Sequence, residues 1–379
     1  MPPSGQDEPL RVVFAWPTIS GYMSACWRAL TDQSGIDPFV LAFEAGPRTG
    51  VNGWLIGGIS SRLPDEEKRQ DGRTVRDLLA ARGPDVVVLS GWFHPPYRRL
   101  PVRGALRDAR FVMGMDTPWM GTSRQQLGRL VLRPFVQKMD KVVVTGERCW
   151  QYARRLGVPQ PDIVRGLYGV DLDELAPIWE RRRADEWPRS FLFVGRFADE
   201  KAVDVLVKGY ARYREQVEAP WPLVCCGKGP MAGRLDRQPG IDNRGFVQPD
   251  GMADVWAEAG AFVLPSRFDP WPLALVEAAA AGLPVVCSDA CGSAVELVSN
   301  GYNGLRVPDE DAAALADALA RIHNTYDDLP EWGRRAQQFA MPYSAERWAG
   351  RWARLLTAVG AESPRSEVGS EEVPSRPQL

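Results

Sequence analysis

Short apolar runs alternate along the first half of the chain with longer segments that have helical periodicity. The apolar runs are RVVFAW (11–16), DVVVLS (85–90), RFVMGM (110–115) and KVVVTG (141–146). A candidate helix over 21–31 follows the first run, and TVRDLLAAR (74–82) precedes the second. Alternation of this kind predicts parallel β/α units with helices on both faces of a sheet.

The same alternation starts again in the second half. Expected strands are SFLFVG (190–195), PLVCCG (222–227), AFVLP (261–265) and PVVCS (284–288), and expected helices are 202–216, 252–260 and 273–282. Two further segments, 312–323 and 344–359, place aliphatic and Trp residues at i, i+3 and i+4, which is typical of amphipathic helices.

A polar, charged segment bounded by prolines, 173–190, separates the two halves and indicates a linker. We therefore expect an α/β protein with two doubly wound, Rossmann-like domains facing each other across a deep cleft. The expected units are an N-terminal domain (8–175), a C-terminal domain (188–342), a helix (343–360) that crosses back to the N-terminal domain, and a Ser/Pro/Glu-rich disordered tail (361–379).

Composition is that of a soluble globular protein, with 45% hydrophobic and 25% charged residues. No signal peptide and no membrane-spanning run is recognisable, so we expect a cytoplasmic protein. The six cysteines form no C-x-x-C pair and lie mostly in apolar contexts, which favours reduced, packed thiols. With only two histidines, a His/Cys metal site is not expected.

Charge is divided unevenly. Residues 1–170 carry 23 Lys and Arg against 16 Asp and Glu, whereas the whole chain has a net charge of −2. The excess is concentrated in 95–110 and 123–141. One interpretation is solvated helix faces. The other is an anionic partner, such as a phosphorylated lipid or the inner membrane surface, reached by peripheral contact; nucleic acid is not expected.

Residues that could bind a ligand directly follow the predicted strands of the second half. In FVGRFADEK (193–201), Gly195 ends a strand, and Arg196 and Lys201 lie near the start of the next helix. Two cations at a helix N-terminus can bind phosphate oxygens, although such residues are also common on solvated surfaces. CCGKGP (225–230), with Gly227, is either a second ligand-binding turn or simply a tight turn.

An acidic residue interrupts an otherwise apolar helix. After the expected strand 261–265, RFDPWP (267–272) contains two prolines, of which Pro272 suits the first helical position. Glu277 then follows inside an Ala-rich helix. An unpaired buried carboxylate is costly, so Glu277 either caps a neighbouring backbone or accepts hydrogen bonds from a ligand. Its two oxygens suit a vicinal diol.

These residues resemble glycosyltransferase family 4, the retaining group 1 transferases with the GT-B fold. The family pattern of two acidic residues separated by seven, followed by A-x-G-x-P-V-V, resembles Asp269, Glu277 and AAAAGLPVV (278–286). Its G-R-x-x-x-x-K element resembles Gly195, Arg196 and Lys201. GVDLDELAP (169–177) and GYNGLRVP (301–308) resemble further family segments, so that the resemblance covers about 140–325 and is weaker over 10–140.

The resemblance implies a role for each matched residue. Glu277 would bind the donor's ribose hydroxyls, Arg196 and Lys201 would neutralise the leaving diphosphate, and Asp269 would lie beside the transferred sugar. No metal or other cofactor is expected; the donor substrate would be a UDP- or GDP-sugar. Front-face departure, with the donor phosphate accepting the acceptor's proton, is the proposal usual for the family. Residues expected around the bound nucleotide sugar are Gly195, Gly227, Val247, Leu273 and, in the N-terminal domain, Gly21.

The chain departs from the family pattern at several positions. Asp269 stands where Glu is usual, and Pro272 replaces a glycine, which removes an N–H from the sugar site. WPTISGYM (16–23) occupies the place of the glycine-rich first loop, without its double glycine. In MGMDTPW (113–119), Met115 replaces a histidine and leaves Asp116, which either orients the donor sugar or acceptor hydroxyl or caps the following segment.

We therefore expect a retaining hexosyltransferase that moves sugar from a nucleotide-diphosphate sugar to a hydroxyl of a glycan, a lipid-linked saccharide or a small molecule. Such activity fits cell-envelope polysaccharide or glycoconjugate biosynthesis. Two alternatives are a phosphorylase-like enzyme of the same fold and a non-catalytic partner subunit that binds nucleotide or glycan. Retention of Arg196, Lys201 and Glu277 argues against the non-catalytic alternative.

Overall fold

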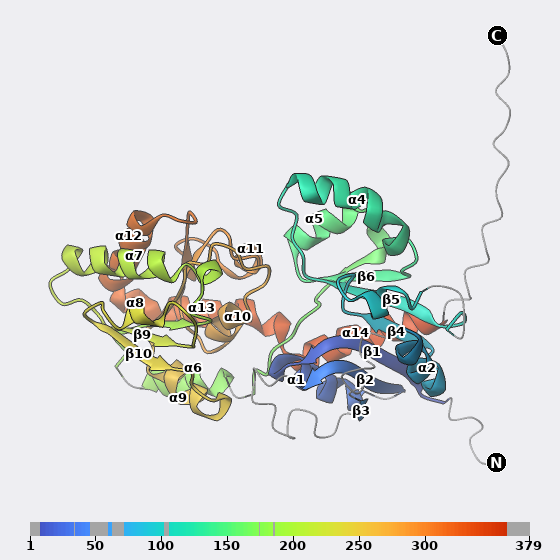
Figure 1. Ribbon diagram of the computed structural model, residues 1–379. Helices are drawn as coiled ribbons and strands as arrows, with labels where there is room; N and C mark the ends of the chain where they lie inside the picture. Colours follow the sequence, from blue (N-terminus) through green and yellow to red (C-terminus); the bar gives the residue numbers. More distant parts are fainter. Residues whose placement is uncertain are drawn as a thin grey trace, which may run out of the picture.

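The computed structural model describes residues 8–33, 35–45, 60–62, 72–101, 106–173, 175–184 and 186–361 of the 379-residue chain. Figure 1 shows two lobes, each built of helices around a central sheet, one from the N-terminal half and one from the C-terminal half. Within the described ranges, no helix is long and apolar enough to cross a membrane.

The N-terminal domain is built on a seven-stranded parallel sheet with the strand order β3-β2-β1-β4-β5-β6-β7. Its strands are β1 (Leu10–Ile19), β2 (Ile36–Ala45), β3 (Ser60–Arg62), β4 (Val86–Leu89), β5 (Arg110–Met115), β6 (Lys141–Val144) and β7 (Ile163–Arg165). Its helices are α1 (Gly21–Thr31), α2 (Gly72–Arg82), α3 (Pro95–Arg98), α4 (Ser123–Val136) and α5 (Glu147–Arg155). Each residue of β4 is buried, as expected for a parallel strand covered on both faces.

Helices cover both faces of this sheet because successive strand residues point to opposite sides. Val12 and Phe14 belong to one apolar cluster, which includes side chains of α1. Val13 and Ala15 belong to a second cluster, formed with α2, α3, the C-terminal end of α4 and α5. The central strands are thus buried between two helical layers.

The C-terminal domain contains a six-stranded parallel sheet with the order β10-β9-β8-β11-β12-β13. The strands are β8 (Phe191–Val194), β9 (Leu223–Cys226), β10 (Ile241–Gly245), β11 (Ala261–Leu264), β12 (Val285–Ser288) and β13 (Gly304–Val307). The helices are α6 (Ala176–Ala184), α7 (Val203–Gln216), α8 (Ala232–Leu235), α9 (Met252–Ala257), α10 (Leu273–Ala280), α11 (Ala294–Leu297), α12 (Ala312–Asn324) and α13 (Leu329–Ala340). All six cysteines are buried free thiols, divided between the two domains.

The segment expected to be a polar linker contains α6, which packs into the C-terminal domain. Ile178 and Trp179 are buried in that domain's core. Arg182 is only 3% exposed and donates hydrogen bonds to the carbonyls of Ala281 and Trp256, and its burial lowers its pKa to about 9. The polar composition is therefore misleading, because one arginine serves as an internal bridge between helix ends.

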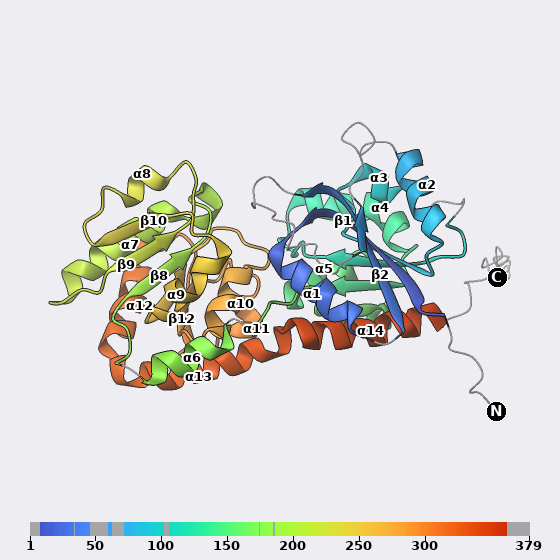
Figure 2. The same ribbon diagram turned by 90° about the horizontal axis from the view of Figure 1, so that it is seen from below.

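The last helix, α14 (Ala345–Ala361), returns to the N-terminal domain. Figure 2 shows it running from the C-terminal lobe along the N-terminal lobe. The indole N–H groups of Trp348 and Trp352 donate to the carbonyls of Leu167 (2.8 Å) and Gly166 (3.1 Å). Both rings pack against Phe14 of β1, so the C-terminal segment is part of the N-terminal core. The predicted disordered tail beyond Ala361 lies outside the described residues.

Candidate active site between the two domains

Backbone hydrogen bonds join three loops at the carboxyl ends of β8, β9 and β10. The amide of Gly195 donates to the carbonyl of Cys226 (3.0 Å), and that of Gly227 donates to the carbonyl of Gly245 (2.7 Å). A Cβ on Gly227 would lie 1.9 Å from the carbonyl oxygen of Gly195. Gly227 also has φ of +153°, a conformation that favours glycine. The two predicted glycines therefore set how closely these loops approach.

Lys201 and Asp269 form an ion pair between two of the predicted segments. Lys201 ends a short 3₁₀ turn, η4 (Asp199–Lys201), just before α7, and Asp269 lies in the loop between β11 and α10. Their side chains are 16% and 11% exposed. Arg196 is different, because its side chain is 74% exposed and pairs with Glu200 at 2.6 Å. Thus Lys201 is held in place, whereas Arg196 extends into solvent.

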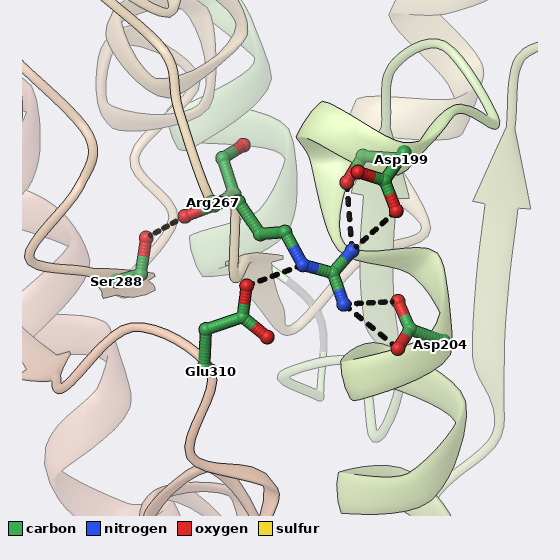
Figure 3. Close-up of polar contacts among 6 residues, drawn as sticks. Asp199, Asp204, Arg267, Ser288 and Glu310 are labelled. Carbon is green, nitrogen blue, oxygen red and sulfur yellow. Dashed lines mark hydrogen bonds and ion pairs between the residues drawn. The ribbon is translucent and has the colours of Figure 1, made fainter.

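Arg267 joins the two segments that carry this ion pair, and the sequence patterns did not single it out. Its guanidinium donates to the carbonyl of Asp199 (2.8 Å) and pairs with Asp204 (2.7 Å) and Glu310, as Figure 3 shows. Its backbone N–H donates to the carbonyl of Glu200 (2.9 Å). Arg267 therefore fixes the start of α7 against the loop of Asp269. The only sequence signal is an arginine two residues before that aspartate.

Glu277 is the fifth residue of α10 and lies among buried neighbours. Pro272 is the residue preceding this helix rather than its first residue. Burial raises the pKa of the Glu277 carboxyl to about 7. Within the described parts of the chain, no side chain forms a hydrogen bond or ion pair with this carboxyl, and it caps no backbone. The capping alternative is therefore not realised, and binding of a ligand remains the prediction for this carboxyl.

Asp116 is the predicted carboxylate of the N-terminal domain. It directly follows β5, and the hydroxyl of Tyr168 donates to its Oδ2 at 3.0 Å. The following helix, α4, is instead capped by Thr122, so Asp116 does not have the predicted alternative role as a cap. Burial raises the pKa of Asp116, and the Tyr168 hydrogen bond opposes this effect.

Tyr22, near the start of α1, packs beside the tyrosine that binds Asp116. Its ring contacts Tyr168 edge-on, with centroids 5.5 Å apart. Its pKa is raised first by burial and further by the nearby charges of Asp116 and Glu277. Both Asp116 and Glu277 are thus close enough to Tyr22 for their charges to affect its pKa. Neither Tyr22 nor Tyr168 was predicted from the sequence: within WPTISGYM (16–23) only Gly21 was expected to meet the donor, and Tyr168 lies just before GVDLDELAP (169–177).

The remaining predicted residues lie at element ends. Gly21 is exposed and begins α1, whose first turn has no acidic residue and no side-chain cap. Val247 follows β10 and Leu273 begins α10; both are partly buried against the C-terminal core. Their expected contacts with a nucleotide remain predictions.

Two family models match the chain in succession. One, described as "Glycosyl transferase 4-like domain", matches residues 19–166, and the other, "Glycosyl transferases group 1", matches residues 188–325. The chain belongs to the group 1 glycosyltransferases. This assignment confirms the family resemblance seen in the sequence. Lys201, Asp269 and Glu277, which carry that resemblance, are the candidate active-site residues.

The chain matches only part of the length of its curated relatives. An exopolysaccharide phosphotransferase of Streptomyces coelicolor is 28% identical over 58% of this chain and 23% of its own. A D-inositol 3-phosphate glycosyltransferase of Kribbella flavida is 33% identical over 47% of this chain and 46% of its own. The chain thus spans less than half the length of these two relatives.

Solved structures share the complete fold of the glycosyltransferase. HepE of Anabaena, in complex with UDP and glucose, has a TM-score of 0.70 at 16% identity and covers 92% of this chain and 100% of its own. Sucrose-phosphate synthase of Thermosynechococcus elongatus has a TM-score of 0.71 at 18% identity, with coverages of 93% and 99%. Together they confirm the predicted GT-B architecture.

The two domains of the glycosyltransferase touch at the N-terminus of α5. Oε1 of Glu296, in α11, accepts from the backbone N–H of Glu147 at 2.6 Å, and Arg148 donates to the carbonyl of Asp289 at 2.6 Å. A Cβ on Gly146 would lie 2.4 Å both from Glu296 Oε1 and from the ring of Trp271. Since Gly146 has an extended φ of −163°, the glycine is needed for space and not for its backbone conformation.

We expect Gly146→Ala to lower kcat for glycosyl transfer by about 10- to 100-fold, because a methyl group here separates the domains that carry Asp116 and Glu277. Steady-state kinetics and the radius of gyration from X-ray scattering measure the two effects. Gly128→Ala is the matched control, since a Cβ there meets nothing within 4 Å. Unchanged kcat and scattering for Gly146→Ala would show that this contact is not needed for turnover.

Proposed function

We propose that this glycosyltransferase moves a hexose from a nucleotide-diphosphate sugar to a hydroxyl of a glycan, lipid-linked saccharide or small molecule, with retention of anomeric configuration. The process would belong to cell-envelope polysaccharide or glycoconjugate biosynthesis. The observation that carries the proposal is Glu277, whose carboxyl has no hydrogen-bond or ion-pair partner among the described residues and which lies eight residues after the Lys201-bound Asp269. A carboxylate that can accept from two ribose hydroxyls and a lysine ammonium that can bind phosphate oxygens are together suited to a nucleotide diphosphate.

In the proposed complex, Glu277 binds the ribose and Lys201 faces the diphosphate. Arg196, whose side chain is exposed, folds over the same phosphate oxygens. Asp269 is held by Lys201 beside the transferred sugar, and positive charge at the leaving diphosphate stabilises the transition state. HepE, of the same fold, is seen with UDP and glucose, which supports a uridine donor, with guanosine as the second choice.

In the same proposal, Asp116 faces the reacting sugar or the acceptor hydroxyl. Tyr168 holds the carboxyl of Asp116 through the hydroxyl hydrogen bond at 3.0 Å and so acts as a positioning residue. Gly21, at the open N-terminus of α1, lets the donor approach the backbone closely. The proton of the acceptor hydroxyl passes to the donor phosphate as the sugar is transferred.

Thermal unfolding with a panel of uridine, guanosine and adenosine diphosphate sugars tests the donor proposal. At about 100 times its Kd, a bound donor is expected to stabilise the protein by about 2.7 kcal/mol, and Glu277→Ala is expected to lose that shift. Lack of a shift for each member of the panel would refute the nucleotide-sugar site and favour a non-catalytic subunit. A shift that persists in Glu277→Ala would place the nucleotide elsewhere.

A further inference from the structure

Helix α4 has one apolar side against the protein and a second one open to solvent. Leu132, Phe135 and Val136 face the N-terminal core. On the other side, Leu127, Leu130 and Val131 are 68%, 65% and 72% exposed. Their i, i+3, i+4 spacing places them in one outward stripe, which we call the α4 patch. Figure 1 shows α4 at the outer edge of its lobe, well away from α14.

The segment that contains the α4 patch carries only basic charges. Between Thr117 and Met139 the chain has four cationic residues and no acidic residue. The four, all exposed, are Arg124, Arg129, Arg133 and Lys138. At 100° per residue, Arg124 flanks the stripe on one side and Arg133 on the other, while Arg129 lies nearly opposite the stripe. An exposed aliphatic stripe between cations is the pattern of a helix that lies in a membrane interface.

We propose that the α4 patch docks on a bilayer that contains anionic lipids, with the aliphatic side chains inserted and the arginines at the headgroups. The charges beside the α4 patch favour a bilayer over two other possible partners, a second copy of this chain and nucleic acid. A second copy of this chain in a symmetric dimer would place the same cations opposite one another. Nucleic acid would match the cations but would leave the aliphatic stripe without apolar contacts. An anionic bilayer satisfies both features.

Docking through α4 would bring the active site close to the membrane. Six residues, 117–122, connect Asp116 at the end of β5 to the start of α4. A docked α4 therefore holds the region of Asp116 and Tyr168 near the bilayer surface. This deepens the proposed function, on which it rests, by selecting a lipid-linked saccharide or glycolipid as acceptor. The docking itself is independent of catalysis.

Flotation of the full chain with vesicles tests the docking, comparing pure phosphatidylcholine with phosphatidylcholine mixed with phosphatidylglycerol. We expect binding to the mixed vesicles only, weakened by high salt. Arg124→Gln/Arg129→Gln/Arg133→Gln is expected to weaken partitioning about fivefold per arginine, or about 100-fold in total. Leu127→Ser/Leu130→Ser/Val131→Ser is expected to abolish it, while both variants keep the thermal midpoint of the wild type.

The matched control is Arg212→Gln/Arg234→Gln/Arg237→Gln, which removes the same charge from exposed positions on the C-terminal domain. This control is expected to bind as the wild type does. Absence of binding, or equal binding to both vesicle types, would overturn the proposal. Sedimentation showing dimers that the Leu/Val variant loses would assign the patch to a second copy instead. Nucleotide-induced stabilisation, measured in the same samples, separates failed docking from a failed donor site.

Discussion

Replacing Lys201 with methionine is expected to lower kcat for glycosyl transfer by about 100- to 1,000-fold, because it removes the fixed positive charge beside the leaving group. The ammonium is 16% exposed and pairs with Asp269, which is 11% exposed. Lys201→Met therefore also leaves a largely buried carboxylate unpaired. We expect a loss of about 3 kcal/mol in the free energy of unfolding. Release of the nucleoside diphosphate and denaturant unfolding measure the two effects separately.

The double variant Lys201→Met/Asp269→Asn separates stability from catalysis. Because it removes both charges, it is expected to recover most of the stability that Lys201→Met loses. Turnover is expected to stay low, since the cation at the diphosphate is still missing. If the double variant regained turnover together with stability, Lys201 would act only by neutralising the buried carboxylate of Asp269. If Lys201→Met kept wild-type turnover, the assignment of the diphosphate site would be wrong.

The parts of the site that are local in sequence could be predicted from it. The apolar run of β11, the two prolines after it and the Ala-rich helix containing Glu277 follow one another within about twenty residues. Gly195 and Gly227 were predictable for a similar reason, because each directly ends a strand of a parallel sheet. Alternating apolar runs and helices likewise indicated two parallel sheets, and the structure confirms them.

Contacts between distant segments could not be predicted in this way. Arg267 pairs with Asp204, 63 residues away, and the hydroxyl of Tyr168 reaches Asp116, 52 residues away. Glu296 accepts from the backbone of Glu147 across 149 residues. No periodicity encodes such pairs, because they depend on how loops at the sheet edges and the two domains are placed. The exposed stripe of α4 was hidden for the same reason, since an amphipathic pattern does not say which side is covered.

Glu277→Gln is expected to weaken donor binding by about 10- to 100-fold, because a neutral amide replaces the charge-assisted acceptor of the ribose hydroxyls. The wild type should also show a pH dependence that the variant lacks. With a pKa of about 7, the carboxyl is mostly protonated at pH 6. Donor affinity in the wild type is therefore expected to rise about tenfold from pH 6 to pH 8. Isothermal titration of both proteins at several pH values measures this difference.

Donor affinity should rise with pH, whereas the free energy of unfolding of the ligand-free protein should fall with pH. The pKa of Glu277 is about 7 in the folded protein and 4.5 in the unfolded chain. The contribution of this carboxyl to the free energy of unfolding is therefore complete below pH 4.5 and is lost as the pH rises through 7. Relative to the wild type, Glu277→Gln is expected to be equally stable at pH 4 and more stable at pH 8, by about 3 kcal/mol at most. Weaker binding together with higher stability cannot result from misfolding. A variant that loses both would instead show that Glu277 supports the fold.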